Sequence, residues 1–244
     1  MDWLTQQPFA HRGLHNKQQG VIENSRRAFA AAITQGYGIE LDVQLSRDGQ
    51  AMVFHDRGLK RLTGQPGKLQ ALTAKELAEI NLSGGVDVIE TLPAILALIG
   101  GKVPVLVEVK TTPREEAGKL EDAVATALDH YNGPAAMMSF APSSVAWFAQ
   151  NAPHIVRGVV AMDFVKEPAG LAWAERVVLA QLLHIDRTDP DFIAYNQAHL
   201  PHNSVSRLKR EGMPVLSWTV RDQAAANRIT PYIDQIIFEG FTPA

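Results

Sequence analysis

Two histidines stand directly after short apolar runs of the sequence. His11 closes "PFAH", and His55 follows "AMVF" with Asp56 next to it. Imidazoles titrate near neutral pH, so two of them at one site can supply a proton acceptor and a proton donor. Cleavage of a phosphodiester by an internal hydroxyl requires such a pair. We therefore predict that His11 and His55 are catalytic, with acid and base unassigned, and that Asp56 orients His55 or a neighbouring backbone amide.

Acidic residues share one face of two further apolar segments. Side chains alternate along a strand, so "GIELDVQL" places Glu40, Asp42 and Gln44 on one face. In "VPVLVEVK", Glu108 and Lys110 share a face in the same way. Parallel strands in a barrel are covered on both sides, so these polar faces are expected to point into the barrel rather than into solvent.

The three carboxylates of Glu40, Asp42 and Glu108 form an oxygen-rich set. Such a set suits one hard divalent cation, Mg²⁺ or Ca²⁺, better than zinc. Beside it, Arg12 offers a fork of donors for phosphate oxygens, and Lys110 offers a point charge. The structural alternative is a buried salt bridge between Lys110 and one of the carboxylates. We predict a metal site, with Arg12 and Lys110 as phosphate contacts.

The elements that must position these residues follow a βα pattern. Short apolar runs alternate with helical patterns along nearly the whole sequence, which is typical of a parallel sheet covered by helices. Eight such runs predict a closed α/β barrel of the TIM type, (β/α)8. The expected strands are 8–11, 39–45, 103–109, 135–140, 155–161, 192–195, 215–220 and 235–238. Little sequence follows the eighth run, so the last helix of an ideal barrel is expected to be missing.

The length of 244 residues fits one domain, expected over 1–244. The segment 57–89 contains a loop and a short helix with a Thr73/Glu76 capping box, more than a bare crossover needs. We interpret it as a short insertion after the second strand. "IENS" places Glu23 and Asn24 just before the first barrel helix, where Asn24 is either a helix cap or also a ligand contact.

Charge and composition exclude several classes of protein. A formal net charge of −3 gives no general attraction to nucleic acid or to an anionic membrane. The absence of cysteine excludes disulfides and thiolate metal sites. No apolar stretch approaches the ~20 residues of a membrane helix, and the start lacks the features of a signal peptide. We expect a cytoplasmic protein with no nucleic-acid partner and no stable membrane insertion, and leave its oligomeric state open.

The motifs "HRG", "EN", "ELD", "DG", "HD", "TG", "ETL" and "EVK" follow one another from Phe9 onward, and "LSWTV" comes late in the chain. In this ordered series the sequence resembles the glycerophosphodiester phosphodiesterase family. The resemblance implies a TIM-type barrel that hydrolyses glycerophosphodiesters to sn-glycerol 3-phosphate and an alcohol with a divalent cation. It implies metal ligation by the three carboxylates, acid/base catalysis by the two histidines, and Trp218 in the substrate pocket, where we also place Glu23 and Asn24.

The end of the sequence departs from this family. "IIFEGFTPA" carries Glu239, Gly240 and Phe241 where members commonly have an aspartate and a proline, which bears on the local shape of the pocket. One alternative is a related barrel phosphodiesterase acting on lysolipid or phosphoinositide, which needs an apolar rim that the sequence does not obviously supply. Another is a catalytically silent phosphodiester-binding member, whose usual signature is loss of a histidine or a metal ligand.

Overall fold

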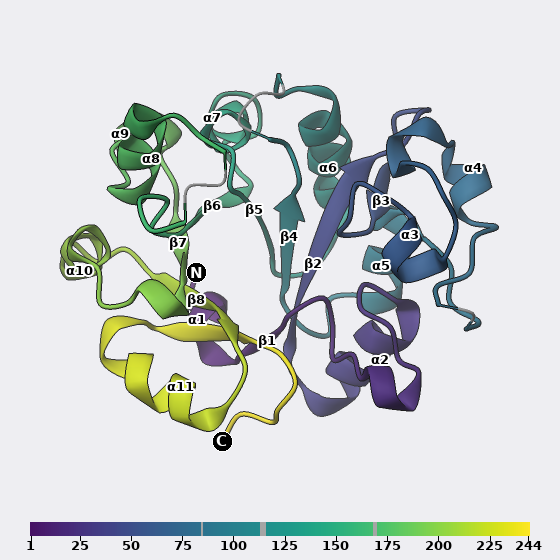
Figure 1. The fold of residues 1–244 in the computed structure, drawn as a ribbon, viewed down its shortest axis with the longest axis horizontal. Coiled ribbons are helices and arrows are strands. Elements are labelled where there is room, and N and C mark those ends of the chain that lie inside the picture. Colours follow the sequence, from purple (N-terminus) through teal and green to yellow (C-terminus); the bar gives the residue numbers. More distant parts are fainter. Residues whose placement is uncertain (84, 113–115, 168–169) are drawn as a thin grey trace.

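The computed structural model describes residues 1–83, 85–112, 116–167 and 170–244. Within these residues, eight parallel strands close into a barrel, which confirms the predicted TIM-type fold (Figure 1). In chain order they are β1 (Phe9–Ala10), β2 (Gly38–Leu45), β4 (Val105–Val109), β5 (Ala135–Ser139), β6 (Val156–Ala161), β7 (Phe192–Asn196), β8 (Val215–Val220) and β9 (Gln235–Phe238). The barrel closes because β1 pairs with both β2 and β9.

Helices form a ring outside the strands (Figure 1). They are α2 (Arg26–Gln35), α5 (Leu92–Ile99), α6 (Lys119–Asp129), α7 (Pro142–Asn151), α8 (Trp173–Ala180), α9 (Ile185–Thr188), α10 (Asn203–Arg210) and α11 (Gln223–Ile229). The 3₁₀ turns η1 (Lys17–Gln19), η3 (Gln197–His199) and η4 (Thr230–Tyr232) lie in the connections. Residues 239–244, after β9, contain no helix, as expected. Among the described residues, no helix is long and apolar enough to span a bilayer.

The start of α2 decides what the Asn24 side chain can do. The Ser25 hydroxyl accepts a hydrogen bond from the Ala28 backbone N–H, so Ser25 is the helix cap. Asn24 precedes the cap with a left-handed φ of 54°, a conformation that asparagine tolerates better than most residues. Its side chain is thereby turned away from the helix and toward β2.

Two apolar layers hold the barrel. On the outer layer, Val105, Val107 and Val109 of β4 pack with the helices, as the alternation predicts. The inner cluster contains Leu4, Phe9, Leu106, Ala136, Met138, Val160, Phe192, Ala194, Leu216 and Ile237, with Leu4 supplied by α1 (Trp3–Gln6). Glycines make room for its rings, because a Cβ on Gly38 would lie 2.5 Å from the Phe9 ring. Inward polar side chains are left nearer the carboxyl ends of the strands, where barrel enzymes hold their catalytic groups.

One extra strand lies outside the barrel. The apolar run before His55 forms β3 (Ala51–Val53), which pairs with β2 in the antiparallel direction. His55 therefore returns toward the barrel on a hairpin, rather than standing at the end of a parallel strand. This difference arises because a three-residue apolar run carries no signal of its direction.

The segment 57–89 follows this hairpin. Its described residues contain α3 (Lys60–Thr63), η2 (Leu69–Ala71) and α4 (Ala74–Leu77), and Thr73 and Glu76 form the expected capping box. Apolar residues of this segment make a cluster with Met52 and Phe54. In Figure 1, α3 and α4 lie on the side of β2 and β3. A single domain over 1–244 with this segment as an insertion stays a prediction.

Candidate active site

A cavity of about 360 Å³ opens where the barrel strands end. Seven of the predicted site residues line it: His11, Arg12, Glu40, His55, Glu108, Lys110 and Trp218. They come from the ends of four barrel strands and from the β2–β3 hairpin. The barrel therefore brings both imidazoles, two of the predicted metal ligands and both predicted phosphate contacts to one space.

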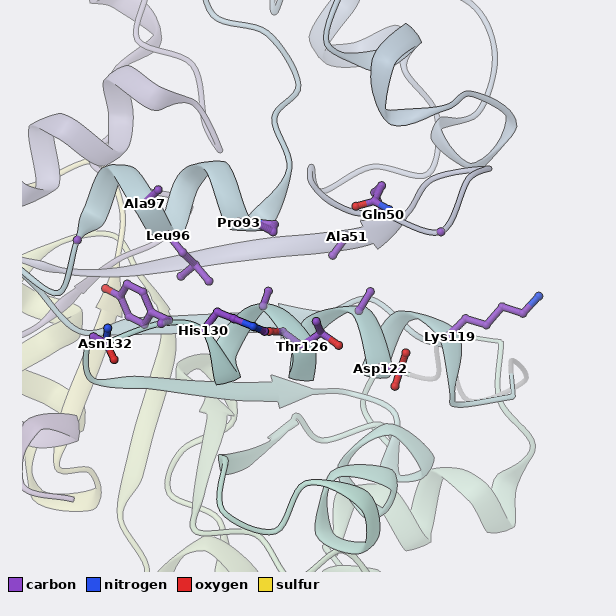
Figure 2. A pocket seen from close by; sticks show the side chains of 15 residues that line it. Gln50, Ala51, Pro93, Leu96, Ala97, Lys119, Asp122, Thr126, His130 and Asn132 are labelled. Carbon is purple, nitrogen blue, oxygen red and sulfur yellow. The ribbon is translucent and has the colours of Figure 1, made fainter.

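A larger hollow of about 690 Å³ lies outside the barrel between α5 and α6 (Figure 2). Leu96 and Ala97 of α5 line one side, and Asp122 and Thr126 of α6 line the other. Among the described residues its lining includes none of the predicted site residues. Converging titratable groups therefore single out the smaller cavity as the candidate active site.

The strand register assembles the three carboxylates. Asp42 of β2 lies opposite Glu108 of β4, and Glu40 precedes Asp42 on the same face. All three are buried, and each offers a ligand oxygen within 4.8 Å of the others. Glu40 Oε1 is buried and has no hydrogen-bond partner among the described residues. A buried unpaired carboxylate oxygen is costly, so this cluster fits a divalent cation.

Asp42 is also held by protein cations. Lys110 Nζ lies 2.9 Å from Asp42 Oδ1, and Arg12 Nε lies 3.2 Å from Asp42 Oδ2. The Asn24 amide donates a hydrogen bond of 2.8 Å to Asp42 Oδ2. Lys110 Nζ also donates to Glu108 Oε1 at 2.6 Å. The buried salt bridge considered as an alternative is thus present, with two carboxylates rather than one, but it does not include the third.

The two carboxyls of β2 have opposite pKa shifts. Burial raises the pKa of Asp42, but Lys110 and Arg12 outweigh burial and hold that pKa below its usual range. Burial also raises the pKa of Glu40, and the charges of Asp42 and Glu108 raise it further, well above the ordinary value. Glu40 is therefore less readily ionised than Asp42, although the Arg12 backbone N–H donates a hydrogen bond of 2.9 Å to Glu40 Oε2.

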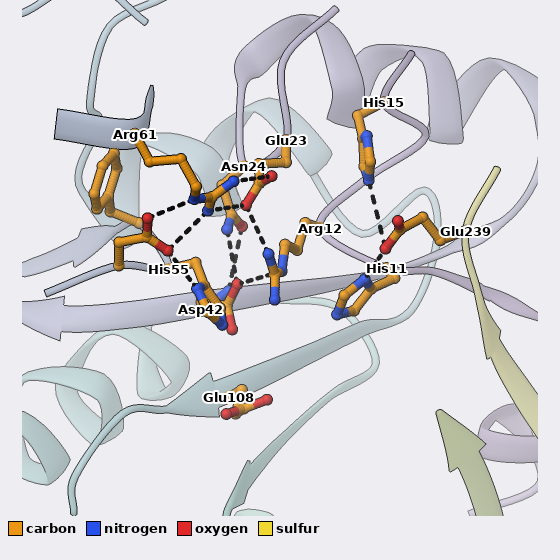
Figure 3. A network of polar contacts seen from close by, with 12 residues as sticks. His11, Arg12, His15, Glu23, Asn24, Asp42, His55, Arg61, Glu108 and Glu239 are labelled. Carbon is orange, nitrogen blue, oxygen red and sulfur yellow. Dashed lines mark hydrogen bonds and ion pairs between the residues drawn. The ribbon is translucent and has the colours of Figure 1, made fainter. Parts of the chain in front are cut away.

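In each of the two candidate catalytic histidines, ring nitrogen Nδ1 contacts a carboxylate. His55 Nδ1 lies 2.7 Å from Asp56 Oδ1, so Asp56 contacts the ring, the first of its two predicted roles. The Gln44 amide donates to the carbonyl oxygens of residues 54, 55 and 56 at 2.9, 3.0 and 2.7 Å, which fixes this segment to β2. His11 Nδ1 lies 2.7 Å from Glu239 Oε2, a contact that the sequence did not predict (Figure 3).

The environment of His55 favours the neutral imidazole. Burial lowers the pKa of His55, and Lys110 and Arg12 lower it as well, against the opposing effects of Asp42 and Asp56. A neutral ring accepts a proton, and a pKa below the ordinary value of about 6.5 keeps it neutral at physiological pH. The site is thus poised for proton transfer near neutrality.

Glu23 and Asn24 lie behind the cavity rather than in its wall. Glu23 Oε1 accepts a hydrogen bond of 2.7 Å from Arg12, and Asn24 contacts Asp42. Neither is among the described residues that line the cavity. The sequence predicts both residues in the substrate pocket, and this stays a prediction. In the structure Glu23 contacts Arg12, a predicted phosphate contact, and Asn24 contacts Asp42, a predicted metal ligand.

Arg61 of α3 joins two parts of the site, and no sequence pattern singled it out. Its guanidinium donates to both oxygens of Glu23 at 2.8 Å and to both oxygens of Asp56 at 2.5 and 2.8 Å (Figure 3). The two carboxylates that Arg61 bridges are themselves in contact with other site residues: Glu23 contacts Arg12, and Asp56 contacts His55. Arg61 therefore links the segment 57–89 to a predicted phosphate contact, Arg12, and to a predicted catalytic residue, His55.

Replacing Arg61 by alanine or lysine is expected to lower kcat by about 10-fold, comparable to the loss of an outer-shell hydrogen bond at other sites. Lysine should not restore activity, because a point charge cannot bridge two carboxylates as a guanidinium does. Steady-state kinetics on the purified variants measures this. Arg47→Ala is the control, since it removes an exposed ion pair with Glu76 and a hydrogen bond to the Ala71 carbonyl oxygen in the same region. Equal activities of the Arg61 and Arg47 variants would contradict the expectation.

Trp218 lines the cavity from β8. Its indole N–H donates a hydrogen bond of 3.0 Å to the Ala194 carbonyl oxygen, and its ring packs edge-to-face on Phe140 at 5.3 Å between centroids. Phe140 also lines the cavity but was not predicted. The two rings give one side of the space an apolar wall, which suits the carbon atoms of a small alcohol.

Comparisons with known proteins identify the family of the chain. The model of the glycerophosphoryl diester phosphodiesterase family matches residues 11–238. A glycerophosphodiester phosphodiesterase of Bacillus altitudinis is 32% identical over 171 residues, covering 66% of this chain and 68% of that protein. One of Caldanaerobacter subterraneus subsp. tengcongensis is 30% identical over 241 residues, covering 93% of this chain and 91% of that protein.

Solved structures share the fold. An Oleispira antarctica phosphodiesterase in complex with the product sn-glycerol-3-phosphate matches with a TM-score of 0.80 and 24% identity, covering 96% of this chain and 93% of that one. A Thermotoga maritima glycerophosphodiester phosphodiesterase matches with a TM-score of 0.73 and 25% identity, covering 94% and 92%. The chain belongs to the glycerophosphoryl diester phosphodiesterase family, and its enzyme class is that of the phosphoric diester hydrolases, as its motifs predicted.

Proposed function

We propose that this chain hydrolyses glycerophosphodiesters to sn-glycerol 3-phosphate and an alcohol, with one divalent cation and two catalytic histidines. The observation that carries the proposal is one cavity lined by both histidines, by Arg12 and Lys110, and by two of the inward carboxylates, Glu40 and Glu108. Support also comes from the Oleispira antarctica phosphodiesterase of the same fold, which was solved with that product.

Substrate binding uses the positive groups of the cavity. Arg12 and Lys110 contact the phosphate oxygens, and the apolar wall of Trp218 takes the carbon atoms of the glycerol or the alcohol. Glu40, Asp42 and Glu108 hold the cation, Mg²⁺ or Ca²⁺. When bound, this ion supplies positive charge against the phosphoryl oxygens as charge gathers there.

The two imidazoles move the protons. One histidine accepts the proton of the glycerol 2-hydroxyl as its oxygen attacks phosphorus, and the other donates a proton to the oxygen of the departing alcohol. This step gives a cyclic phosphate. Water then attacks phosphorus with the two histidines in exchanged roles, which opens the ring to sn-glycerol 3-phosphate and returns both imidazoles to their starting states. Arg12 and Lys110 stabilise the charge on the phosphoryl oxygens in both steps.

The test is release of sn-glycerol 3-phosphate from a panel of glycerophosphodiesters carrying choline, ethanolamine or glycerol. We expect turnover that a chelator abolishes and that added Mg²⁺ or Ca²⁺ restores. Lysolipid in vesicles, assayed in parallel, separates this activity from the lipid-directed alternative. Turnover that persists in excess chelator would overturn the metal requirement, and no turnover of any ester in the presence of metal would favour a binding-only protein.

A further inference from the structure

We propose that Glu239 is a positioning residue for His11: its carboxylate fixes the ring and keeps the proton on Nδ1, so that Nε2 is the nitrogen presented to substrate. The role of His11 in this inference rests on the proposed function. The contact itself is a hydrogen bond between residues 228 positions apart in the chain.

The closing seam of the barrel brings the two residues together. β1 pairs with β9 in the register Phe9 to Ile237 and Ala10 to Phe238. The backbone N–H of His11 donates a hydrogen bond of 2.9 Å to the Phe238 carbonyl oxygen, which extends the β1–β9 pairing by one residue. His11 and Glu239 are therefore the next residues along the two seam strands, and neighbouring side chains at such positions lie within contact distance.

The backbone around Glu239 is fixed on both sides. Its N–H donates to the Val220 carbonyl oxygen at 2.9 Å, which ties it to the end of β8. Gly240 follows with a left-handed φ of 79°, and the Phe241 ring packs edge-to-face on Phe238 at 5.8 Å. The departure from the family pattern after the last strand thus builds a tight turn that holds the carboxylate against His11.

Both oxygens of the carboxylate have positive or titratable neighbours. Oε2 lies 2.7 Å from His11 Nδ1 and 4.0 Å from His15 Nε2 (Figure 3). Oε1 lies 3.7 Å from Arg221 Nε. The Asp42 carboxylate on β2 also interacts electrostatically with His11. The hydrogen bond with His11 is the main cause that lowers the pKa of Glu239 to about 2, against the effect of burial. Glu239 is therefore an anion throughout the range in which imidazole titrates.

An anion at Nδ1 decides which nitrogen does the chemistry. A carboxylate only accepts hydrogen bonds, so the ring must carry its proton on Nδ1, and the lone pair of the neutral ring lies on Nε2. As a base, Nε2 accepts the substrate proton, and as an acid, Nε2–H returns one. In both cases the Nδ1 proton stays on the ring, and Glu239 remains a carboxylate that stabilises the imidazolium. Asp56 contacts Nδ1 of His55 in the same way.

The experiment reads the tautomer of His11 directly by NMR. Two-bond ¹H–¹⁵N correlation spectra of the ¹⁵N-labelled chain, recorded above the imidazole titration, distinguish a proton on Nδ1 from one on Nε2. The His11 signals are assigned by their loss in His11→Gln. We expect the Nδ1–H tautomer in the wild-type chain and a shift toward Nε2–H in Glu239→Ala. Asp56→Ala is the matched control, which should change the His55 signals and leave those of His11 in place.

Kinetics provides the second readout. Glu239→Ala should lower kcat by at least about 10-fold, which is less than the 10²- to 10⁴-fold that the general acid or base itself contributes, and change KM by less than about 3-fold. If this variant does not fold, Glu239→Met keeps the side-chain length and carries the same expectations. An Nε2–H tautomer in the wild-type chain, a tautomer unaltered by the substitution, or an unchanged kcat would overturn the inference.

The two proposals fail separately. Full turnover by His11→Ala would end the proposed role of His11, whereas the NMR result does not depend on activity. An inactive His11→Ala beside a fully active Glu239→Ala would leave the proposed function standing and remove only the role of Glu239.

Discussion

Alanine in place of either His11 or His55 is expected to lower kcat by about 10²- to 10⁴-fold, the contribution of one positioned acid or base. Both imidazoles line the one cavity, and each has its Nδ1 bound to a carboxylate. KM should change little, because Arg12 and Lys110 remain to bind phosphate. Steady-state release of sn-glycerol 3-phosphate at saturating metal measures the effect.

The double variant tests whether the two histidines act as a unit. Removing both should cost far less than the product of the single effects, because one proton transfer is of little use without the other. His130→Ala is the control, since that exposed ring is hydrogen-bonded to the Thr126 carbonyl oxygen of its own helix and is not among the described residues that line the active-site cavity. A double variant with undiminished turnover would remove the basis of the proposed mechanism.

Neutralising the two carboxyls of β2 should change the stability of the metal-free protein in opposite directions. Asp42→Asn removes one carboxylate partner from both Lys110 and Arg12, and breaking a buried ion pair typically costs about 3–5 kcal/mol. Glu40→Gln removes a buried charge whose pKa is raised, and should therefore raise Tm. At about 2–4 °C per kcal/mol for a chain of this size, Asp42→Asn should lower Tm by roughly 6 °C or more.

The pH dependence follows from the same pKa shifts. The folded pKa of Glu40 is raised, so its contribution to stability is present below its unfolded pKa of about 4.3 and is lost as pH rises toward the folded value. The folded pKa of Asp42 is lowered, so its contribution is present above about 3.9 and is lost as pH falls. Glu40→Gln should therefore flatten the decline in Tm on the alkaline side.

Thermal melts in chelator, from pH 4 to 8, check these signs, and titration with Mg²⁺ or Ca²⁺ checks the site. Added metal should raise the Tm of the wild-type chain by mass action and that of Glu40→Gln much less. A metal-free Glu40→Gln protein that melts below the wild type would show that the Glu40 carboxylate is already compensated.

The sequence predicted those features that depend on local periodicity. Alternation in "GIELDVQL" and "VPVLVEVK" identified the inward faces, and the register of β2 with β4 set Asp42 beside Glu108. Because every barrel strand points the same way, a residue near a strand's carboxyl end could be assigned to the correct mouth without knowing its neighbours. The eight predicted strands overlap the eight barrel strands, because each was predicted from its own local apolar run.

What the sequence could not show depends on contacts made at a distance. Arg61 stands in a segment with no strand or barrel-helix periodicity, so nothing in "RGLKRLTG" marks it as the partner of Glu23. Glu239 was noticed only as a departure, since its contact with His11 exists only once β1 and β9 pair. A charged residue directly after the last strand, at the level of the other strand-end groups, was the one signal available. No sequence signal indicated that β3 runs antiparallel to β2.

The contact between His11 and Glu239 forms only when β9 pairs with β1, so it depends on closure of the barrel. Consider a partly folded barrel in which every strand except β9 has docked. It already contains the three carboxylates of Glu40, Asp42 and Glu108 and the His55–Asp56 pair. It still lacks the partner that orients the other imidazole, because Glu239 arrives with β9. During refolding, recovery of turnover should therefore lag behind recovery of the helical circular dichroism signal. Activity then reports whether the barrel has closed.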